Sequence, residues 1–195
     1  MSDFTNTAAE NLQRANEILE ETGLFRIWES VGAKPHLVGS LRTGLLMKHL
    51  DIDLHIYSDP FSLSASFAAM AELAQNREIK RIEYANLLET EEKCLEWHAW
   101  FQDDDDRLWQ IDMIHIHADS PFAGYFEKVA DRIREALTPE TRHAILAIKN
   151  EMPLENKANS IAIYQSVIRD GVRNYREFLE WTRNNPADGI MEWMP

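Results

Sequence analysis

Hydrophobic and polar residues alternate most regularly over residues 51–57, where Asp51, Asp53 and His55 interleave with isoleucine and leucine. A period of two is typical of a β-strand that buries one face. The three polar side chains therefore share the opposite face of the predicted strand.

Two further β-prone runs, Cys94 to Phe101 and Leu108 to His117, are separated by an acidic turn and predict a hairpin. In the second run, alternation places Gln110 and Asp112 on one face with two isoleucines. Asp112 is then a carboxylate in an otherwise apolar strand, a costly position unless a charge or a metal ion accompanies it.

Helical periodicity occupies much of the remaining chain, and the Thr138-Pro139 pair marks one helix start through an N-cap and a first-turn proline. We predict an α+β fold, with a mixed, mostly antiparallel sheet, helices on one side of it and a helical C-terminal module. Residues 1–119 form the predicted catalytic core and residues 120–195 the helical module. The predicted helices span 5–22, 24–31, 62–75, 122–137, 138–148, 159–170 and 175–183, and a further strand spans 79–88.

The segment before the alternating strand contains a small-residue turn, Gly39-Ser40, followed by Arg42 and a short helix-compatible stretch over 45–50. Glycine allows the backbone to approach a phosphate closely, and Ser40 offers both its N–H and its hydroxyl as donors. Arg42 can add a charge-assisted contact to the same phosphate. This turn is therefore a candidate phosphate site.

Asp51 and Asp53 point the same way from the strand and repel each other unless a positive charge lies between them. A divalent cation meets that need, since Mg²⁺ takes oxygen ligands and keeps part of its shell for water and phosphates. The two carboxylates are therefore candidate metal ligands.

The spaced pattern of Val38-Gly39-Ser40 and Asp51-Ile52-Asp53 resembles the nucleotidyltransferase superfamily of the DNA polymerase β type. The resemblance implies transfer of a nucleoside monophosphate from a nucleoside triphosphate such as ATP to an acceptor hydroxyl, with release of pyrophosphate. It also implies a third carboxylate, for which Asp112 is the candidate, as a metal ligand, as the group that accepts the hydroxyl's proton, or as both. Two Mg²⁺ ions, or Mn²⁺, would bridge the carboxylates and the triphosphate.

Several other residues have both a functional and an ordinary interpretation. Lys149 and Tyr164 are weak candidates for contacts with nucleotide or acceptor, although such residues on amphipathic helices are more often core or surface. His55 shares the face of the aspartate pair, either at the edge of the site or in direct contact. His115 and His117 are expected to be structural rather than zinc ligands. The acidic turn 103–106 is expected to be solvated.

The amino-acid composition limits which substrates and binding partners are expected for this protein. The chain has 195 residues, a net charge of −13 and an isoelectric point near 4.9, which argues against a polymerase-like grip on nucleic acid. We therefore expect the acceptor to be a small molecule and consider nucleic acid an unlikely partner. A single cysteine, no apolar run of membrane-spanning length and no secretory signal lead us to expect a cytoplasmic protein without a membrane partner.

Two alternative functions remain open on the sequence. The first is a regulatory or antitoxin-like binding protein that keeps the fold, and failure to bind any nucleotide would favour it. The second is a metal-dependent phosphohydrolase that uses the same carboxylates, and it differs from a transferase in its products.

Overall fold

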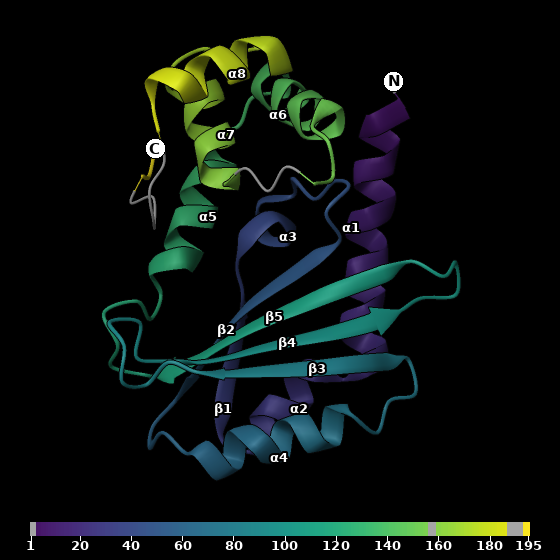
Figure 1. The fold of residues 1–195 in the computed structure, drawn as a ribbon, viewed down its shortest axis with the longest axis vertical. Coiled ribbons are helices and arrows are strands. Elements are labelled where there is room, and N and C mark those ends of the chain that lie inside the picture. The colour runs from purple at the N-terminus through teal and green to yellow at the C-terminus, as the bar shows by residue number, and fades with distance from the viewer. Residues whose placement is uncertain (1–2, 156–158, 187–192) are drawn as a thin grey trace.

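The structure is a computed structural model that describes residues 3–155, 159–186 and 193–195. A central sheet separates helices at its lower side from a helical layer above it (Figure 1). The strands are β1 (Ala33–Leu37), β2 (Asp51–Ser58), β3 (Ile79–Asn86), β4 (Leu95–Gln102) and β5 (Leu108–His117). The helices are α1 (Asp3–Thr22), α2 (Leu24–Ser30), α3 (Gly39–Thr43), α4 (Leu63–Leu73), α5 (Tyr125–Ala136), α6 (Pro139–Glu151), α7 (Ser160–Ile168) and α8 (Tyr175–Asn184).

The five described strands pair in the order β1-β2-β5-β4-β3. Only β2 and β5 are parallel, while the other neighbours are antiparallel. The predicted mixed, mostly antiparallel sheet and the β4–β5 hairpin are confirmed. The parallel pair matters for the site because it sets β2 and β5 side by side although 49 residues lie between them in the sequence.

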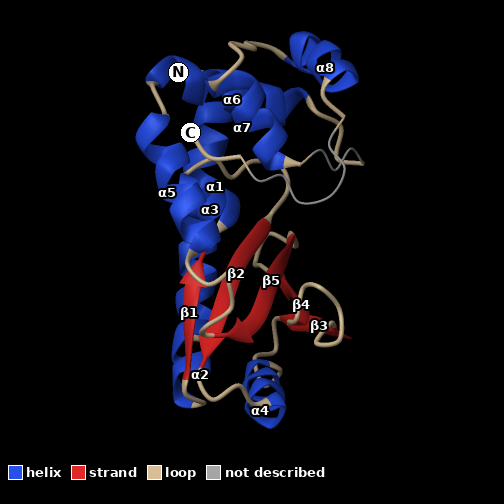
Figure 2. Ribbon diagram, turned by 90° about the vertical axis from the view of Figure 1, so that its left-hand side faces the viewer, coloured by secondary structure: helices blue, strands red, loops and turns tan. Residues whose placement is uncertain are grey.

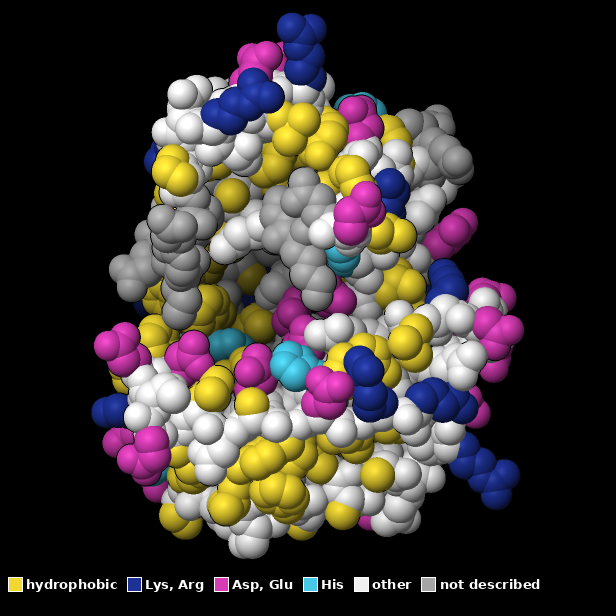
Figure 3. Space-filling view, viewed as in Figure 1, with side chains coloured by type: hydrophobic (Ala, Val, Ile, Leu, Met, Phe, Trp, Pro, Cys, Tyr) yellow, Lys and Arg dark blue, Asp and Glu magenta, His cyan; other side chains and the backbone are white. Residues whose placement is uncertain are grey.

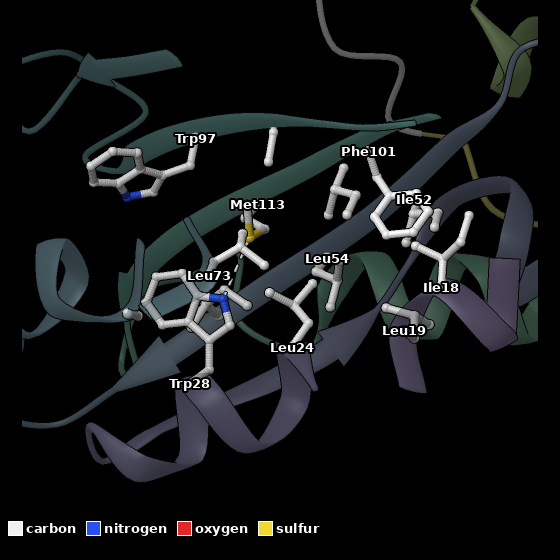
Figure 4. Packing of buried hydrophobic residues seen from close by; sticks show 14 of the residues in the cluster. Ile18, Leu19, Leu24, Trp28, Ile52, Leu54, Leu73, Trp97, Phe101 and Met113 are labelled. Atoms are coloured by element: carbon white, nitrogen blue, oxygen red, sulfur yellow. Dashed lines mark hydrogen bonds between the residues drawn. The ribbon is translucent and has the colours of Figure 1, made fainter. Parts of the chain in front are cut away.

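One face of the sheet is covered by α1, α2 and α4, which supply the principal hydrophobic core (Figure 2). Trp28 of α2 reaches across this layer and donates its indole N–H to the sulfur of Met113 on β5, at 3.4 Å. Leu54 lies near Met113, and Phe101 lies farther along the same layer next to Ile52; all are buried (Figure 4). The apolar half of each alternating strand therefore faces these helices, as the sequence predicts.

A second hydrophobic core joins α5, α6, α7 and α8. Thr138 caps α6 by accepting the backbone N–H of Thr141, which confirms the predicted helix start. Ala8 of α1 also belongs to this core, and α1 contacts α6. Helix α1 thus contributes to both hydrophobic cores. The division into a catalytic core and a helical module at residue 119 stays a prediction. Residues 156–158 and 187–192 of the predicted helical module lie outside the described chain.

Two local expectations differ from the structure. The helix near the Gly-Ser turn begins at Gly39 itself, whereas the stretch 45–50 is not helical. The acidic turn is not fully solvated, because Asp103 is buried. Its carboxylate accepts hydrogen bonds from the Trp109 indole and the Arg107 guanidinium, both at 2.9 Å. Asp103 therefore organises the hairpin turn, since a buried carboxylate is stable only with such donors.

Among the described residues, no helix is both long and apolar enough to cross a membrane.

Candidate active site

The pairing of β2 with β5 brings the three predicted carboxylates together. Asp53 lies opposite Asp112, and Asp51 lies opposite Gln110. Side chains at paired positions project from the same face of a sheet, here the face turned away from the main core. All four line one cavity of about 380 Å³, which also contains Ser40 and Lys149.

Gly39 permits an unusually close approach between the turn and Asp53. Its φ is 61°, and a Cβ at this position would lie 2.0 Å from Asp53 Oδ2. The backbone reinforces the contact, because the Val38 N–H donates to the Asp53 carbonyl at 2.9 Å and the Ser40 N–H donates to the Asp53 carboxylate. Glycine is required both by the left-handed backbone and by the carboxylate beside it.

The electrostatics of Asp53 are those of a site that accommodates a cation. Burial, followed by repulsion from Asp112 and Asp51, raises the pKa of Asp53 to about 7, although Lys149 and the Ser40 N–H act in the opposite direction. A divalent ion between the strands would relieve this repulsion, and an all-carboxylate donor set suits Mg²⁺. Within the described chain, no three His, Cys, Asp or Glu side chains are already gathered as a metal site. The donor chemistry fits the ion, and closer approach of the carboxylates would accompany its binding.

Lys149 reaches the Gly-Ser turn from α6. Its ammonium donates to Ser40 Oγ and to the Leu45 carbonyl, each at 2.9 Å, and it is buried. A buried ammonium is rarely found without such partners. The structure thus places a fixed positive charge beside the predicted phosphate turn, where the sequence offered only a weak candidate.

Tyr164 of α7 completes this cluster. Its hydroxyl lies 3.2 Å from Ser40 Oγ and 3.4 Å from the Lys149 ammonium. Burial of the ring favours the neutral phenol, yet the adjacent Lys149 charge and the hydrogen bond with Ser40 leave the pKa of Tyr164 below its ordinary value. Ser40, Lys149 and Tyr164 come from three elements, so periodicity alone does not reveal their meeting.

Arg42 points to a different neighbour. Its guanidinium makes two hydrogen bonds to Asp131 of α5, at 3.0 and 2.7 Å, and a third to the Leu37 carbonyl at 3.1 Å. These contacts tie α3 to α5. Arg42 is not among the described residues that line the cavities at the carboxylates. The cation beside Ser40 is instead Lys149.

Asp112 has two hydrogen-bond donors that the sequence analysis missed. His98 Nδ1 lies 2.5 Å from Asp112 Oδ1, and Gln110 Nε2 donates to the same oxygen at 2.8 Å. His98 faces Asp112 in the β4–β5 register. The sequence contains a pattern that could have indicated His98: Glu96 and His98 alternate with apolar residues in β4, as Gln110 and Asp112 do in β5.

A second cavity of about 380 Å³ extends from the carboxylates between α5, α7 and the sheet. Its wall is mainly apolar but also includes Glu96 and His98. Four residues belong to both cavities: Ser40, Asp53, Asp112 and Ser160. The additional apolar lining comes from Leu54, Ile114, Phe126, Val129, Ala130, Ile133 and Ile161. The site thus has a polar compartment and an apolar compartment that meet at the carboxylates.

His55 lies on the floor of the apolar cavity, 4.8 Å from the Phe126 ring centre. It is buried, and among the described residues its Nδ1 has no hydrogen-bond partner. Burial, with the neighbouring His36 acting in the same direction, lowers the pKa of His55 to about 4 despite the opposing charge of Glu127. His55 is therefore a neutral side chain in the wall of the site at physiological pH.

Two further candidate histidines, His115 and His117, are not among the described residues that line these cavities. His115 is buried against Trp28 and Phe61, with its Nε2 2.8 Å from Ser58 Oγ. His117 pairs with Asp119 at the end of β5. They project in the direction opposite to Asp112, in keeping with the structural role predicted for them.

The molecular surface is hollowed between the sheet and the helical layer, and acidic side chains gather inside and along the lower rim of this hollow (Figure 3). Concentration of carboxylates at a concave site is unfavourable by itself and is typical of a place where cations or phosphate–metal complexes bind.

The solved structures with a similar fold include an RNA terminal uridylyl transferase and a poly(A) polymerase complex. An RNA terminal uridylyl transferase, Cid1, aligns with a TM-score of 0.59 and 15% identity over 81% of this chain and 46% of its own. Cid1 with bound MgGTP aligns with a TM-score of 0.60 and 15% identity, covering 86% of this chain and 50% of the other. The GLD-2–GLD-3 poly(A) polymerase complex aligns with a TM-score of 0.56 and 11% identity, over 98% and 67%. The chain spans about half the length of the Cid1 structures it matches.

These neighbours correct one expectation from composition. The net negative charge led us to expect a small-molecule acceptor and to consider nucleic acid unlikely, but the structures described above include an RNA terminal uridylyl transferase and a poly(A) polymerase. Net charge describes the average attraction of the surface rather than the chemistry of one cleft. The inference from charge to acceptor was therefore wrong.

No curated protein matches the sequence. The family model of the nucleotidyltransferase domain matches residues 16–115, slightly more than half of the chain, and that span includes the Gly-Ser turn and all three carboxylates. The chain belongs to the nucleotidyltransferase domain family.

Proposed function

We propose that this protein transfers a nucleoside monophosphate from a nucleoside triphosphate to the terminal hydroxyl of an RNA strand, with Mg²⁺ as cofactor. The observation that carries the proposal is the pairing of Asp53 with Asp112 on parallel strands, two residues along β2 from Asp51 and beside Ser40 and Lys149. The names of the similar structures supply the class of acceptor.

The carboxylates have distinct proposed tasks. Asp51 and Asp53 would hold Mg²⁺ with Asp112, and the ion, when bound, would neutralise charge on the phosphates. Asp112 accepts the proton of the acceptor hydroxyl as its oxygen bonds to the α-phosphorus. The bond from that phosphorus to the bridging oxygen breaks at the same time, and pyrophosphate leaves.

The Gly39-Ser40 turn and Lys149 would hold the phosphates. Lys149 donates a hydrogen bond to Ser40 Oγ, so its ammonium lies directly beside the side chain of the turn. A fixed ammonium at this point favours the negative charge that develops on pyrophosphate. Tyr164 holds the Lys149–Ser40 pair in place, because its hydroxyl contacts both side chains.

The two compartments suggest a division of the substrates. The apolar cavity suits the base of the nucleotide, since flat aromatic groups bind best against apolar walls with few polar groups. The polar cavity, which Asp51 and Gln110 line, suits the phosphates and the acceptor hydroxyl. The carboxylates common to both cavities then lie at the α-phosphorus.

The proposal is tested by incubating the protein with a short single-stranded RNA and each of the four nucleoside triphosphates, with Mg²⁺, Mn²⁺ or EDTA. We expect metal-dependent extension of the RNA on a denaturing gel, with loss of extension in an Asp51→Asn/Asp53→Asn variant. Extension by that variant at the wild-type rate would overturn the assignment of the carboxylates.

The same assay separates the two competing functions. Release of phosphate or pyrophosphate without extension of RNA would indicate a phosphohydrolase. Absence of nucleotide binding in calorimetry, with either metal ion, would indicate a binding protein that retains the fold.

A further inference from the structure

The hydrogen bonds around Asp112 are asymmetric. Two donors, His98 Nδ1 at 2.5 Å and Gln110 Nε2 at 2.8 Å, contact the same oxygen, Oδ1. Within the described residues, Oδ2 has no hydrogen-bond partner. An ionised carboxylate only accepts hydrogen bonds, so His98 presents an Nδ1–H to it. Two donors on one oxygen fix the plane of the carboxylate and leave the other oxygen available.

The imidazole of His98 is itself held from its far side. Its Nε2 lies 3.3 Å from Glu96 Oε1, on the same strand and the same face. The His98 and Asp112 side chains are about three-quarters buried, with 25% and 24% exposure. The geometry is therefore that of an oriented pair within the site wall, since a histidine bound at both nitrogens cannot turn freely.

Such orientation has a physical purpose at this position. Asp53 and Asp112 face each other across neighbouring strands, which lie about 4.8 Å apart. Their repulsion contributes to the raised pKa of Asp53. In the absence of donors, the Asp112 side chain would rotate away from Asp53 and from the space between them. His98 and Gln110 oppose that rotation.

We propose that His98, assisted by Gln110, is a positioning residue that fixes Asp112 through Oδ1 and reserves Oδ2 for the metal ion and the acceptor hydroxyl. This inference rests on the proposed function. It differs from an ordinary surface pair such as His117–Asp119, in which the aspartate side chain is 86% exposed and lines neither cavity at the carboxylates.

The test uses three substitutions of His98 with different hydrogen-bonding reach. His98→Ala removes the donor. His98→Asn places an amide N–H where Nδ1 lies, while His98→Gln places it one bond further away, near the Nε2 position. His117→Ala is the matched control, because it removes a histidine–carboxylate contact from β5 outside the site.

Two measurements are made on each full-length variant: Mn²⁺ binding with a non-hydrolysable nucleoside triphosphate by electron paramagnetic resonance, and steady-state transfer to RNA. For His98→Ala we expect roughly 10- to 100-fold weaker Mn²⁺ binding, a similar fall in kcat and little change in the KM for nucleotide. His98→Asn should restore most of the Mn²⁺ affinity and most of kcat, whereas His98→Gln should restore neither. His117→Ala should have the Mn²⁺ affinity and kcat of the wild type.

The outcomes are decisive in either direction. Wild-type Mn²⁺ binding by His98→Ala would overturn the proposal, as would equal defects in His98→Ala and His98→Asn, which would indicate lost packing rather than a lost hydrogen bond. If the wild-type protein extends no RNA, the proposed function fails, yet the Mn²⁺ measurements still decide the role of His98.

Discussion

The two faces of the central sheet carry side chains of opposite character, although they alternate along the same strands. On β5, Ile111 and Met113 are fully buried under the helices, whereas Gln110 and Asp112 between and beside them line the cavities on the other face. The covered face contributes apolar burial, the main favourable term in folding. The cleft face contributes carboxylates that repel one another.

This difference shows how the fold tolerates the electrostatic repulsion within the candidate site. The repelling carboxylates are placed on strands whose other face is anchored by the core, so local repulsion does not separate β2 from β5. Stability and function are thereby assigned to alternate residues of the same strand. Substitutions on the two faces should have separable effects, which the following experiments measure.

The largest expected effect is on the cleft face. Asp53→Asn removes one charge at constant size, and we expect the rate of transfer to fall roughly 1000-fold, equivalent to about 4 kcal/mol. The free energy of unfolding at pH 8 should not decrease, because repulsion from Asp112 and Asp51 is relieved. Single-turnover kinetics and urea unfolding measure the two quantities. A marked loss of stability without loss of rate would contradict the separation of the faces.

The converse is expected for Ile111→Ala, between Gln110 and Asp112 but on the covered face. Ile111 is fully buried, so the variant should lose about 2 to 5 kcal/mol of unfolding free energy. Its transfer rate per folded molecule should stay near that of wild type at low temperature. Urea unfolding and an activity assay corrected for the folded fraction test this. A selective rate defect in a fully folded variant would show that the faces are coupled.

Two glycines sharpen the comparison at the edge of the site. Gly39 and Gly44 both have positive φ, but a Cβ would meet Asp53 only at Gly39, with nothing within 4 Å at Gly44. Gly44→Ala should cost about 1 to 2 kcal/mol from backbone strain alone. Gly39→Ala should cost more and should also reduce Mn²⁺ affinity, since Asp53 must move. Equal stability and affinity in the two variants would remove the steric explanation.

The smallest expected effect concerns acid stability on the covered face. Burial lowers the pKa of His115 to about 4 from an ordinary value of 6.5. The unfolded chain then binds more protons than the native one between these values, so His115 costs stability as the pH falls from about 6.5 to 4. His115→Gln should reduce this acid-induced loss by about 1 to 2 kcal/mol.

Urea unfolding at pH 7 and pH 4.5 measures the difference. His55 on the cleft face has the same direction of shift and remains in both proteins, so part of the acid sensitivity should persist. An unchanged pH dependence in His115→Gln would mean that His115 is accessible to protons in the native state.

Much of the fold could be predicted from local pattern. Period-two alternation identified β2 and the β4–β5 hairpin, and the Thr138-Pro139 pair identified the start of α6. These features depend on neighbours within a few residues, where backbone geometry dictates which side chains share a face. The helix at Gly39 and the buried Asp103 were missed, because each depends on a contact with another element or on a turn's own donors.

The candidate site also has features that the local sequence predicts and features that depend on distant contacts. The turn at Gly39 and Ser40 and the carboxylates Asp51, Asp53 and Asp112 could be selected from spacing, and their proposed roles await the experiments above. The contacts that these residues make could not, although Lys149 and Tyr164 were already weak candidates on the sequence. Lys149 and Tyr164 lie more than a hundred residues from Ser40, and Arg42 pairs with Asp131 rather than entering the cavities.

The sequence by itself predicted β2, β3, β4 and β5 but not β1, and it predicted the polar face of β2 and the residue types suited to a metal and a phosphate, because periodicity and side-chain chemistry are local properties. Only the tertiary structure decided that β5 lies parallel to β2, that Lys149 is the cation at Ser40, and that His98 holds Asp112. Those relations arise when apolar surfaces from distant segments are buried together, and hydrophobic burial is non-directional, so the sequence pattern does not encode its partners.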